Sequence, residues 1–148
     1  MTYVSDNLMN DIWQKVGAKG TDQILAMQKR HQKDQKALSK FAYEHLLELP
    51  EDAAGVGLYT FHVVVEAFSG LAPRPKTVRR PAIERLWELP TAVLAEEALA
   101  AEPHAAQYLE DALTEEDEVI LTETERAQCS RVVQTAILCL HGACENRP

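Results

Sequence analysis

Apolar residues recur along most of the chain at the three- and four-residue spacing that is typical of amphipathic helices. Near the N-terminus, one predicted helix face carries Leu8, Ile12, Trp13 and Val16. Near the C-terminus, another face carries Cys129, Val133, Ala136 and Leu140. The pattern predicts a single all-α domain over residues 1–148, with about six or seven helices packed as a bundle.

The longest helical pattern runs from about residue 22 to residue 49, where Pro50 ends it. One helix of that length would extend on the order of 40 Å. A domain of this size has a radius of gyration of only about 15 Å. Both ends of the pattern are apolar, whereas its middle, QKRHQKDQK, is polar. We therefore expect one long helix with an exposed middle, or a helix that is broken there.

The most apolar stretch of the chain is GVGLYTFHVVVEAFSG, residues 55–70. Its length and composition predict a central helix near residues 53–69. A strand is the alternative, because Tyr59, Phe61, Val63 and Val65 alternate with other residues. The only other strand candidate, EVILTE at 118–123, is short. We favour the helix.

Proline-rich and capping sequences divide the remaining pattern. The segment LAPRPKTVRRP, residues 71–81, predicts an irregular connector. Thr114-x-x-Asp117 and Thr122-x-x-Glu125 are two candidate capping boxes. EHLLELP at 44–50 and ERLWELP at 84–90 resemble each other, as two copies of a repeat would. We interpret both as amphipathic helices that end at Leu-Pro, and a duplication remains the alternative.

Composition is that of an ordinary globular protein, with 46% hydrophobic and 26% charged residues. The net charge of −8 is uneven, because residues 1–90 carry twelve Lys/Arg and eleven Asp/Glu, whereas residues 91–148 carry three and twelve. An acidic surface disfavours phosphate backbones and anionic lipid. No stretch reaches the ~18 apolar residues of a membrane span. We therefore expect a protein partner, with neither nucleic acid nor membrane.

All three cysteines, Cys129, Cys139 and Cys144, fall on the last predicted helix. Their spacing along one helix argues against a disulfide between them. The N-terminal residues also lack the apolar core of a secretion signal. These features predict a cytoplasmic protein in which the cysteines fill the core.

His62 and Glu66 are the strongest candidate site, since both lie on one polar stripe of the apolar helix. The stripe is a solvent edge, a hydrogen-bonded buried row, a catalytic or metal site, or a contact with a ligand or partner. A metal would need further ligands. His45 and Glu48 are the candidates for that role, with Glu44 and His141 as others. No cofactor other than such a metal is expected.

Two basic segments are candidate partner-binding sites. Lys29, Lys33 and Lys36, followed by Lys40, would line one face of the predicted long helix. The connector carries Arg74, Lys76, Arg79 and Arg80. Either set suits phosphate or an acidic partner. Alternatively, both sets are solvated, or neutralised by the acidic C-terminal half of the same chain.

The function predicted from these features is a non-catalytic interaction or regulatory module. It would act through the acidic C-terminal half or an exposed part of the long helix, and it would self-associate as a homodimer. The alternative is a helical metal-dependent or hydrolytic enzyme centred on His62 and Glu66.

Overall fold

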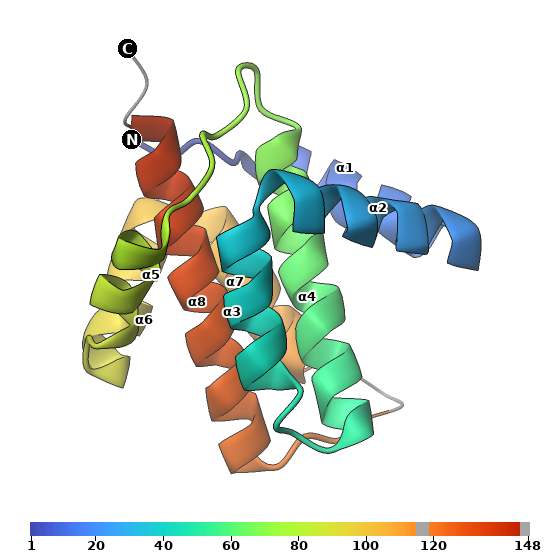
Figure 1. The fold of residues 1–148 in the computed structure, drawn as a ribbon, viewed down its shortest axis with the longest axis vertical. Helices are drawn as coiled ribbons and strands as arrows, with labels where there is room; N and C mark the ends of the chain where they lie inside the picture. The colour runs from blue at the N-terminus through green and yellow to red at the C-terminus, as the bar shows by residue number, and fades with distance from the viewer. Residues whose placement is uncertain (115–118, 146–148) are drawn as a thin grey trace.

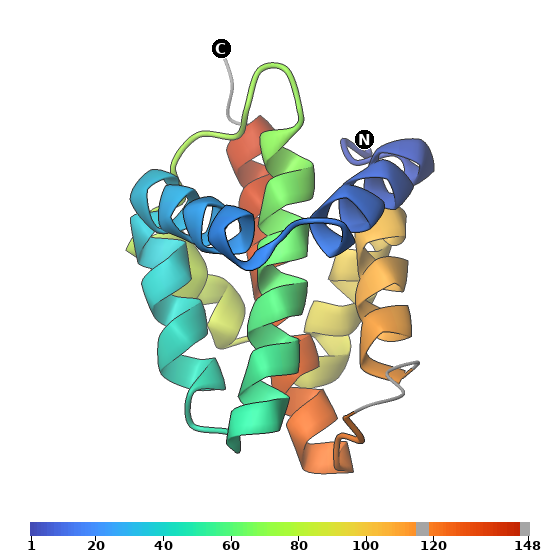
Figure 2. The ribbon, with the colours of Figure 1, turned by 90° about the vertical axis from the view of Figure 1, so that its right-hand side faces the viewer.

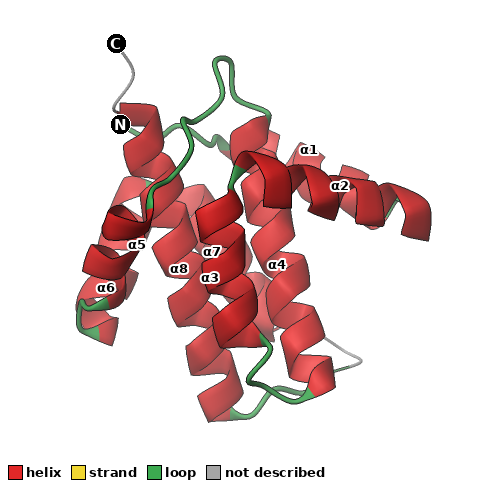
Figure 3. Cartoon of the chain, viewed as in Figure 1, coloured by secondary structure: helices red, strands yellow, loops and turns green. Residues whose placement is uncertain are grey.

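The computed structural model describes residues 1–114 and 119–145, and within these ranges the chain forms eight helices and no strand (Figure 3). The predicted all-α class is confirmed, with one or two helices more than expected. The helices are α1 Asp6–Gly17, α2 Thr21–Asp34, α3 Lys36–Leu46, α4 Glu51–Ser69, α5 Arg80–Trp87, α6 Thr91–Ala101, α7 Pro103–Thr114 and α8 Glu123–Glu145.

Helix α4 is the central element, as its apolar sequence predicts. It packs against α8 on one side, and α3 and α7 flank it (Figure 2). α1 and α2 cross its upper part on the opposite side from α8 (Figure 2). Phe61, Val64 and Phe68 on this helix are fully buried. The strand alternative for residues 55–70 is therefore wrong.

The predicted long helix over residues 22–49 is wrong in its single-helix form, because Gln35 divides it into α2 and α3. Gln35 is buried, with φ −128° and ψ 61°, outside the helical region. Its side-chain Nε2 donates to the carbonyl of Lys76 at 3.1 Å, and its Oε1 accepts from the backbone N–H of Val78 at 2.8 Å. The break therefore anchors the 71–79 connector, while α2 projects from the bundle (Figure 1).

Side-chain caps define several helix ends. Ser5 Oγ accepts from the backbone N–H of Leu8 at 3.1 Å and starts α1. Thr122 and Glu125 form the predicted reciprocal capping box before α8, with bonds of 2.9 and 3.1 Å. The other candidate box, Thr114-x-x-Asp117, includes a residue outside the described ranges.

The two similar Leu-Pro sequences have the same local role. The first contains the last residues of α3 and the second contains the last residues of α5. Pro50 and Pro90 are the N-cap residues of α4 and α6, respectively. Each sequence is therefore a helix–helix junction, which is the interpretation that the sequence favours over a repeat.

Gly57 permits the close approach of α4 to α3 and α8. A Cβ atom at this position would lie 2.9 Å from Leu46 Cδ2 and 2.9 Å from Cys129 Sγ. Both neighbours are fully buried, so neither has open space into which to move. A Cβ at Gly55, two residues earlier, would have no atom within 4 Å.

The N-terminal segment is fixed to the C-terminal half through Glu102, whose side chain is fully buried. The Glu102 carboxylate accepts from the backbone N–H groups of Tyr3 and Val4, each at 3.0 Å. It also lies 2.5 Å from Nδ1 of His141 on α8. This contact seats the start of α1 against the α6–α7 junction.

None of the described helices combines the length and the apolar character needed to cross a membrane. Cys129, Cys139 and Cys144 are all buried and form no disulfide with one another, as expected for residues that fill the core. Burial raises the pKa of Cys129 to about 11 and that of Cys139 to about 12. These two thiols therefore stay protonated and unreactive near neutral pH.

Candidate functional site

A buried chain of hydrogen bonds joins α2, α3 and α4 around the predicted pair. His31 Nε2 lies 3.0 Å from Glu66 Oε1, and His31 Nδ1 lies 2.8 Å from His62 Nδ1. His62 Nε2 lies 2.8 Å from the Tyr43 hydroxyl. Arg30 forms an ion pair with the same oxygen of Glu66. The chain thus runs Arg30–Glu66–His31–His62–Tyr43.

One arrangement of protons satisfies every atom of this chain. Ionised Glu66 accepts from Nε2–H of His31, which leaves Nδ1 of a neutral His31 as an acceptor. His62 then donates its Nδ1–H to that atom, and its Nε2 accepts from the Tyr43 hydroxyl. Both rings are stacked at a centroid distance of 5.1 Å.

The shifted pKa values of His62 and Glu66 agree with the protonation states of these two residues in this arrangement. The pKa of His62 is lowered to about 3, chiefly by burial and also by the neighbouring His31, against the opposing effect of Glu66. The pKa of Glu66 is lowered to about 2, chiefly by the hydrogen bond from His31 and also by Arg30, while burial opposes the shift. At neutral pH, Glu66 is therefore an anion and His62 is neutral.

The hydrogen-bonding atoms of the two histidine rings are all used within the network. His31 and His62 are each only 1% exposed, and all four of their ring nitrogens have partners. His31 also lines a pocket of about 360 Å³. No ring nitrogen is left over to meet a substrate there. The geometry therefore favours the interpretation of the polar stripe on α4 as a hydrogen-bonded buried row.

The other predicted metal ligands lie elsewhere. His45 packs between the rings of Phe41 and Trp87, at centroid distances of 4.9 and 4.5 Å. Glu48 is exposed, and His141 pairs with Glu102. Within residues 1–114 and 119–145, no group of three His, Cys, Asp or Glu side chains is arranged to hold a metal ion.

The basic candidates come from α2, α3 and the connector, and Lys33 and Arg74 line one pocket of about 360 Å³. Lys29 and Lys33 are exposed on α2, whereas Lys36 begins α3. The prediction that these lysines line one face of one helix is wrong, because the backbone changes direction at Gln35.

Two of the four basic residues of the predicted connector lie near carboxylates. Arg74 lies 4.0 Å from the Asp34 carboxylate, and Arg80 lies 3.0 Å from that of Glu84. Lys76 and Arg79 are exposed, and Lys76 contributes its carbonyl to the contact with Gln35.

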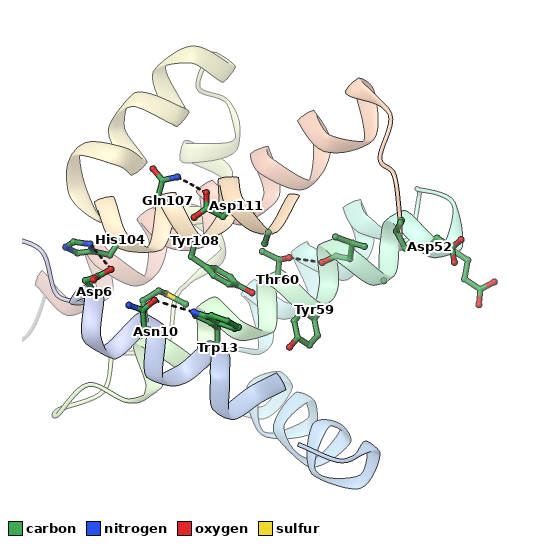
Figure 4. A pocket seen from close by; sticks show the side chains of 16 residues that line it. Asp6, Asn10, Trp13, Asp52, Tyr59, Thr60, His104, Gln107, Tyr108 and Asp111 are labelled. Atoms are coloured by element: carbon green, nitrogen blue, oxygen red, sulfur yellow. Dashed lines mark hydrogen bonds and ion pairs between the residues drawn. The ribbon is translucent and has the colours of Figure 1, made fainter. Parts of the chain in front are cut away.

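A groove between α1, α4 and α7 is a second candidate site (Figure 4). It encloses about 1030 Å³. Trp13 and Tyr108 extend into the space between α1 and α7, and Tyr59 stands beside Trp13 (Figure 4). Trp13 is 44% exposed and Tyr59 is 41% exposed, so a large part of each aromatic side chain is accessible to solvent.

The floor of the groove behaves as an apolar surface. Met9 and Thr60 are buried there, and the Thr60 hydroxyl donates to the carbonyl of Val56 at 2.8 Å. Trp13 Nε1 lies 3.3 Å from Asn10 Oδ1, within α1. The polar atoms of Thr60 and Trp13 thus have partners within their own helices.

The rim of the groove is acidic. Its carboxylates belong to Asp6, Glu51, Asp52 and Asp111. Asp6 stands at one end near His104, at 3.8 Å, and Asp52 stands at the other (Figure 4). Among the described residues that line the groove there is no Lys or Arg.

Sequence reasoning missed the groove and three members of the buried chain. The sequence does indicate that His31 is buried, because Ile24, Met27, His31 and Gln35 follow one another at helical spacing. No sequence pattern indicates the roles of Tyr43 and Arg30, because these roles depend on how α2 and α3 pack against α4. The groove is formed by helices far apart in sequence, so no local motif marks it.

Comparison of the chain with protein-family models, with curated proteins and with solved structures finds no match.

Proposed function

We propose that this protein is a non-catalytic interaction module that binds a segment of a partner protein in the groove between α1, α4 and α7. The observation that carries the proposal is the pair of half-exposed aromatic residues, Trp13 and Tyr59, beside an apolar floor. Tryptophan and tyrosine are enriched among the residues that dominate binding energy at protein interfaces. The volume, about 1030 Å³, is at the upper end of the ~300–1,000 Å³ typical of small-molecule pockets, so a larger occupant suits it.

The buried His31–His62 network supports the same class of function. Its ring nitrogens are used internally, so it acts as a clamp between helices rather than as a source of reactive groups. The three buried thiols support the expectation of a reducing, cytoplasmic setting. Self-association through the same groove remains a form of this proposal.

Selection from a random library of displayed peptides tests the proposal. Peptides are selected on the wild-type protein and then measured against the double variant Trp13→Ala/Tyr59→Ala. A matched control is Leu99→Ala, which removes an exposed apolar side chain on α6 outside the groove. We expect selected peptides to lose at least about tenfold in affinity for the double variant, or ~1.4 kcal/mol, and to retain it for the control. Failure to select any peptide with this dependence would contradict the proposal.

A further inference from the structure

The shape and charge of the groove point to one class of occupant. We infer that the bound segment is an amphipathic helix with an apolar face and with Lys or Arg along its flanks. This inference rests on the proposed function, because it specifies what fills the same groove. Each of its two parts, helix and positive charge, follows from a separate observation.

We infer a helical segment because the groove offers few backbone groups with which a bound peptide could form hydrogen bonds. The groove walls are three helices, with Val119 from the segment before α8, and the described residues include no strand edge. Apart from the first turns of these helices, their backbone N–H and C=O groups along the groove bond within the helices. An extended peptide on the apolar floor would therefore leave its own backbone groups unpaired, which costs roughly 1–3 kcal/mol for each buried group. A helix satisfies these groups internally and presents only side chains.

We infer basic residues on the flanks of the bound helix because the rim of the groove is acidic. Asp6, Glu51, Asp52 and Asp111 surround the groove, and no Lys or Arg is present among its described lining residues. Asp6, Glu51 and Asp52 are exposed, so basic side chains can reach them without leaving solvent. Such rim pairs accelerate association and select against acidic partners, while the apolar floor supplies most of the affinity.

The aromatic residues of the groove determine where the apolar face of the bound helix would pack. Trp13 comes from α1, Tyr59 from α4 and Tyr108 from α7, so one aromatic ring stands on each wall. A helix is about 10 Å wide with its side chains, and it meets three walls at once when it lies along the groove. Its anchors would then recur at three- and four-residue spacing.

Two designed peptides of about 16 residues test the inference. Both carry the same apolar face at helical spacing; one has Lys and Arg on the flanks, and the other has Glu. We expect the basic peptide to bind the wild-type protein at least about tenfold more tightly than the acidic one. We also expect its affinity to fall when salt rises from about 0.1 M to about 1 M. A scrambled basic peptide without the helical spacing should bind at least about tenfold more weakly.

Charge reversal locates the effect. In Asp52→Lys/Asp111→Lys we expect the preference between the two peptides to invert. The matched control is Glu96→Lys/Glu97→Lys, which makes the same change in net charge at exposed positions of α6 outside the groove. The control should keep the wild-type preference. Equal binding of both peptides, or equal effects of the two double variants, would overturn the inference.

The failures of the two proposals are distinguishable. If the displayed library yields groove-dependent peptides that are neutral or acidic, this inference falls and the proposed function stands. If no selected peptide depends on Trp13 and Tyr59, both fall. Light scattering gives a further outcome: if the protein exceeds its chain mass of 16.5 kDa and Trp13→Ala/Tyr59→Ala restores a monomer, the occupant is a second copy and the basic helix is ruled out.

Discussion

His31 and His62 share a hydrogen bond between their two Nδ1 atoms, 2.8 Å apart, within the contact between α2 and α4. A bond between like atoms requires one ring to donate and the other to accept, so two neutral rings hold different tautomers. Ionised Glu66 takes the Nε2–H of His31, so a neutral His31 accepts at Nδ1 and His62 donates. The projecting helix α2 is thereby joined to the centre of the bundle through polar groups as well as through Met27.

The low pKa of His62 predicts a loss of stability in acid. The unfolded chain takes up a proton on this residue near pH 6.5, whereas the folded chain does so only near pH 3. Stability is therefore fully present above pH 6.5 and falls as the pH decreases toward 3, by up to about 1.4 kcal/mol per pH unit for this group. Glu66 adds to the loss below pH 4.5, because its folded pKa is about 2.

Urea unfolding across this pH range measures the effect. The titratable groups that face His62 are His31 of α2, Tyr43 of α3 and Glu66 of its own helix, and Arg30 of α2 pairs with that Glu66. His62→Gln should lower stability at pH 7 and flatten the pH dependence between 6.5 and 3. Leu99→Ala, which removes an exposed side chain without a titratable group, should leave the slope unchanged; equal slopes in the wild-type protein and His62→Gln would contradict the prediction.

Tyr43 and Glu66 should be energetically coupled through the two imidazole rings. Tyr43→Phe removes the donor to His62 Nε2, and Glu66→Gln removes the charge that orients His31. In a double-mutant cycle on the free energy of unfolding, we expect a coupling of at least about 0.5 kcal/mol. The cycle of Tyr43→Phe with Glu84→Gln, an exposed residue of α5, should be additive within about 0.5 kcal/mol. Additivity in the first cycle would show that the chain does not act as a unit.

Loss of the Glu102 carboxylate should be strongly destabilising. Glu102→Ala leaves the N–H groups of Tyr3 and Val4 and the ring of His141 without their buried partner. We expect a loss of about 3–5 kcal/mol in the free energy of unfolding. Glu97→Ala, on the exposed face of α6, should change it by less than about 0.5 kcal/mol. Hydrogen exchange at Tyr3 and Val4 gives a local measure, which should stay slow in the control.

Two glycines of α4 should respond oppositely to alanine. Gly55→Ala adds a methyl group in open space and should stabilise the helix by about 0.5–1 kcal/mol. Gly57→Ala places the methyl 2.9 Å from Leu46 and Cys129, which costs about 1–3 kcal/mol of packing and outweighs the same helical gain. Thermal or urea unfolding of both variants checks the order, and a Gly57→Ala protein as stable as Gly55→Ala would disprove the close approach.

The fold class was predictable because the apolar spacing along the chain is helical and the caps are local. The start of α1 at Ser5 and of α8 at Thr122 could be identified from their sequences alone. The break at Gln35 could not be located, since it depends on a loop that lies about forty residues further along the chain. A helix pattern reports local preference, and tertiary contacts of this kind override it.

The candidate site was predictable only in part. The polar stripe with His62 and Glu66 was visible because two ionisable residues four apart stand out in an apolar helix. Their partner His31 lies in a segment whose composition indicates exposure, although its spacing indicates burial. The groove combines Trp13, Tyr59 and Tyr108 from three helices, and their proximity is a property of packing.

The Glu102 contact has a consequence for the order in which the protein is assembled during synthesis. α1 leaves the ribosome first, yet the carboxylate that seats its leading residues is on the α6–α7 junction, and that carboxylate's other partner is on α8. The first wall of the groove is therefore synthesised early, but it is fixed in place only after a residue 98 positions beyond Val4 has been added.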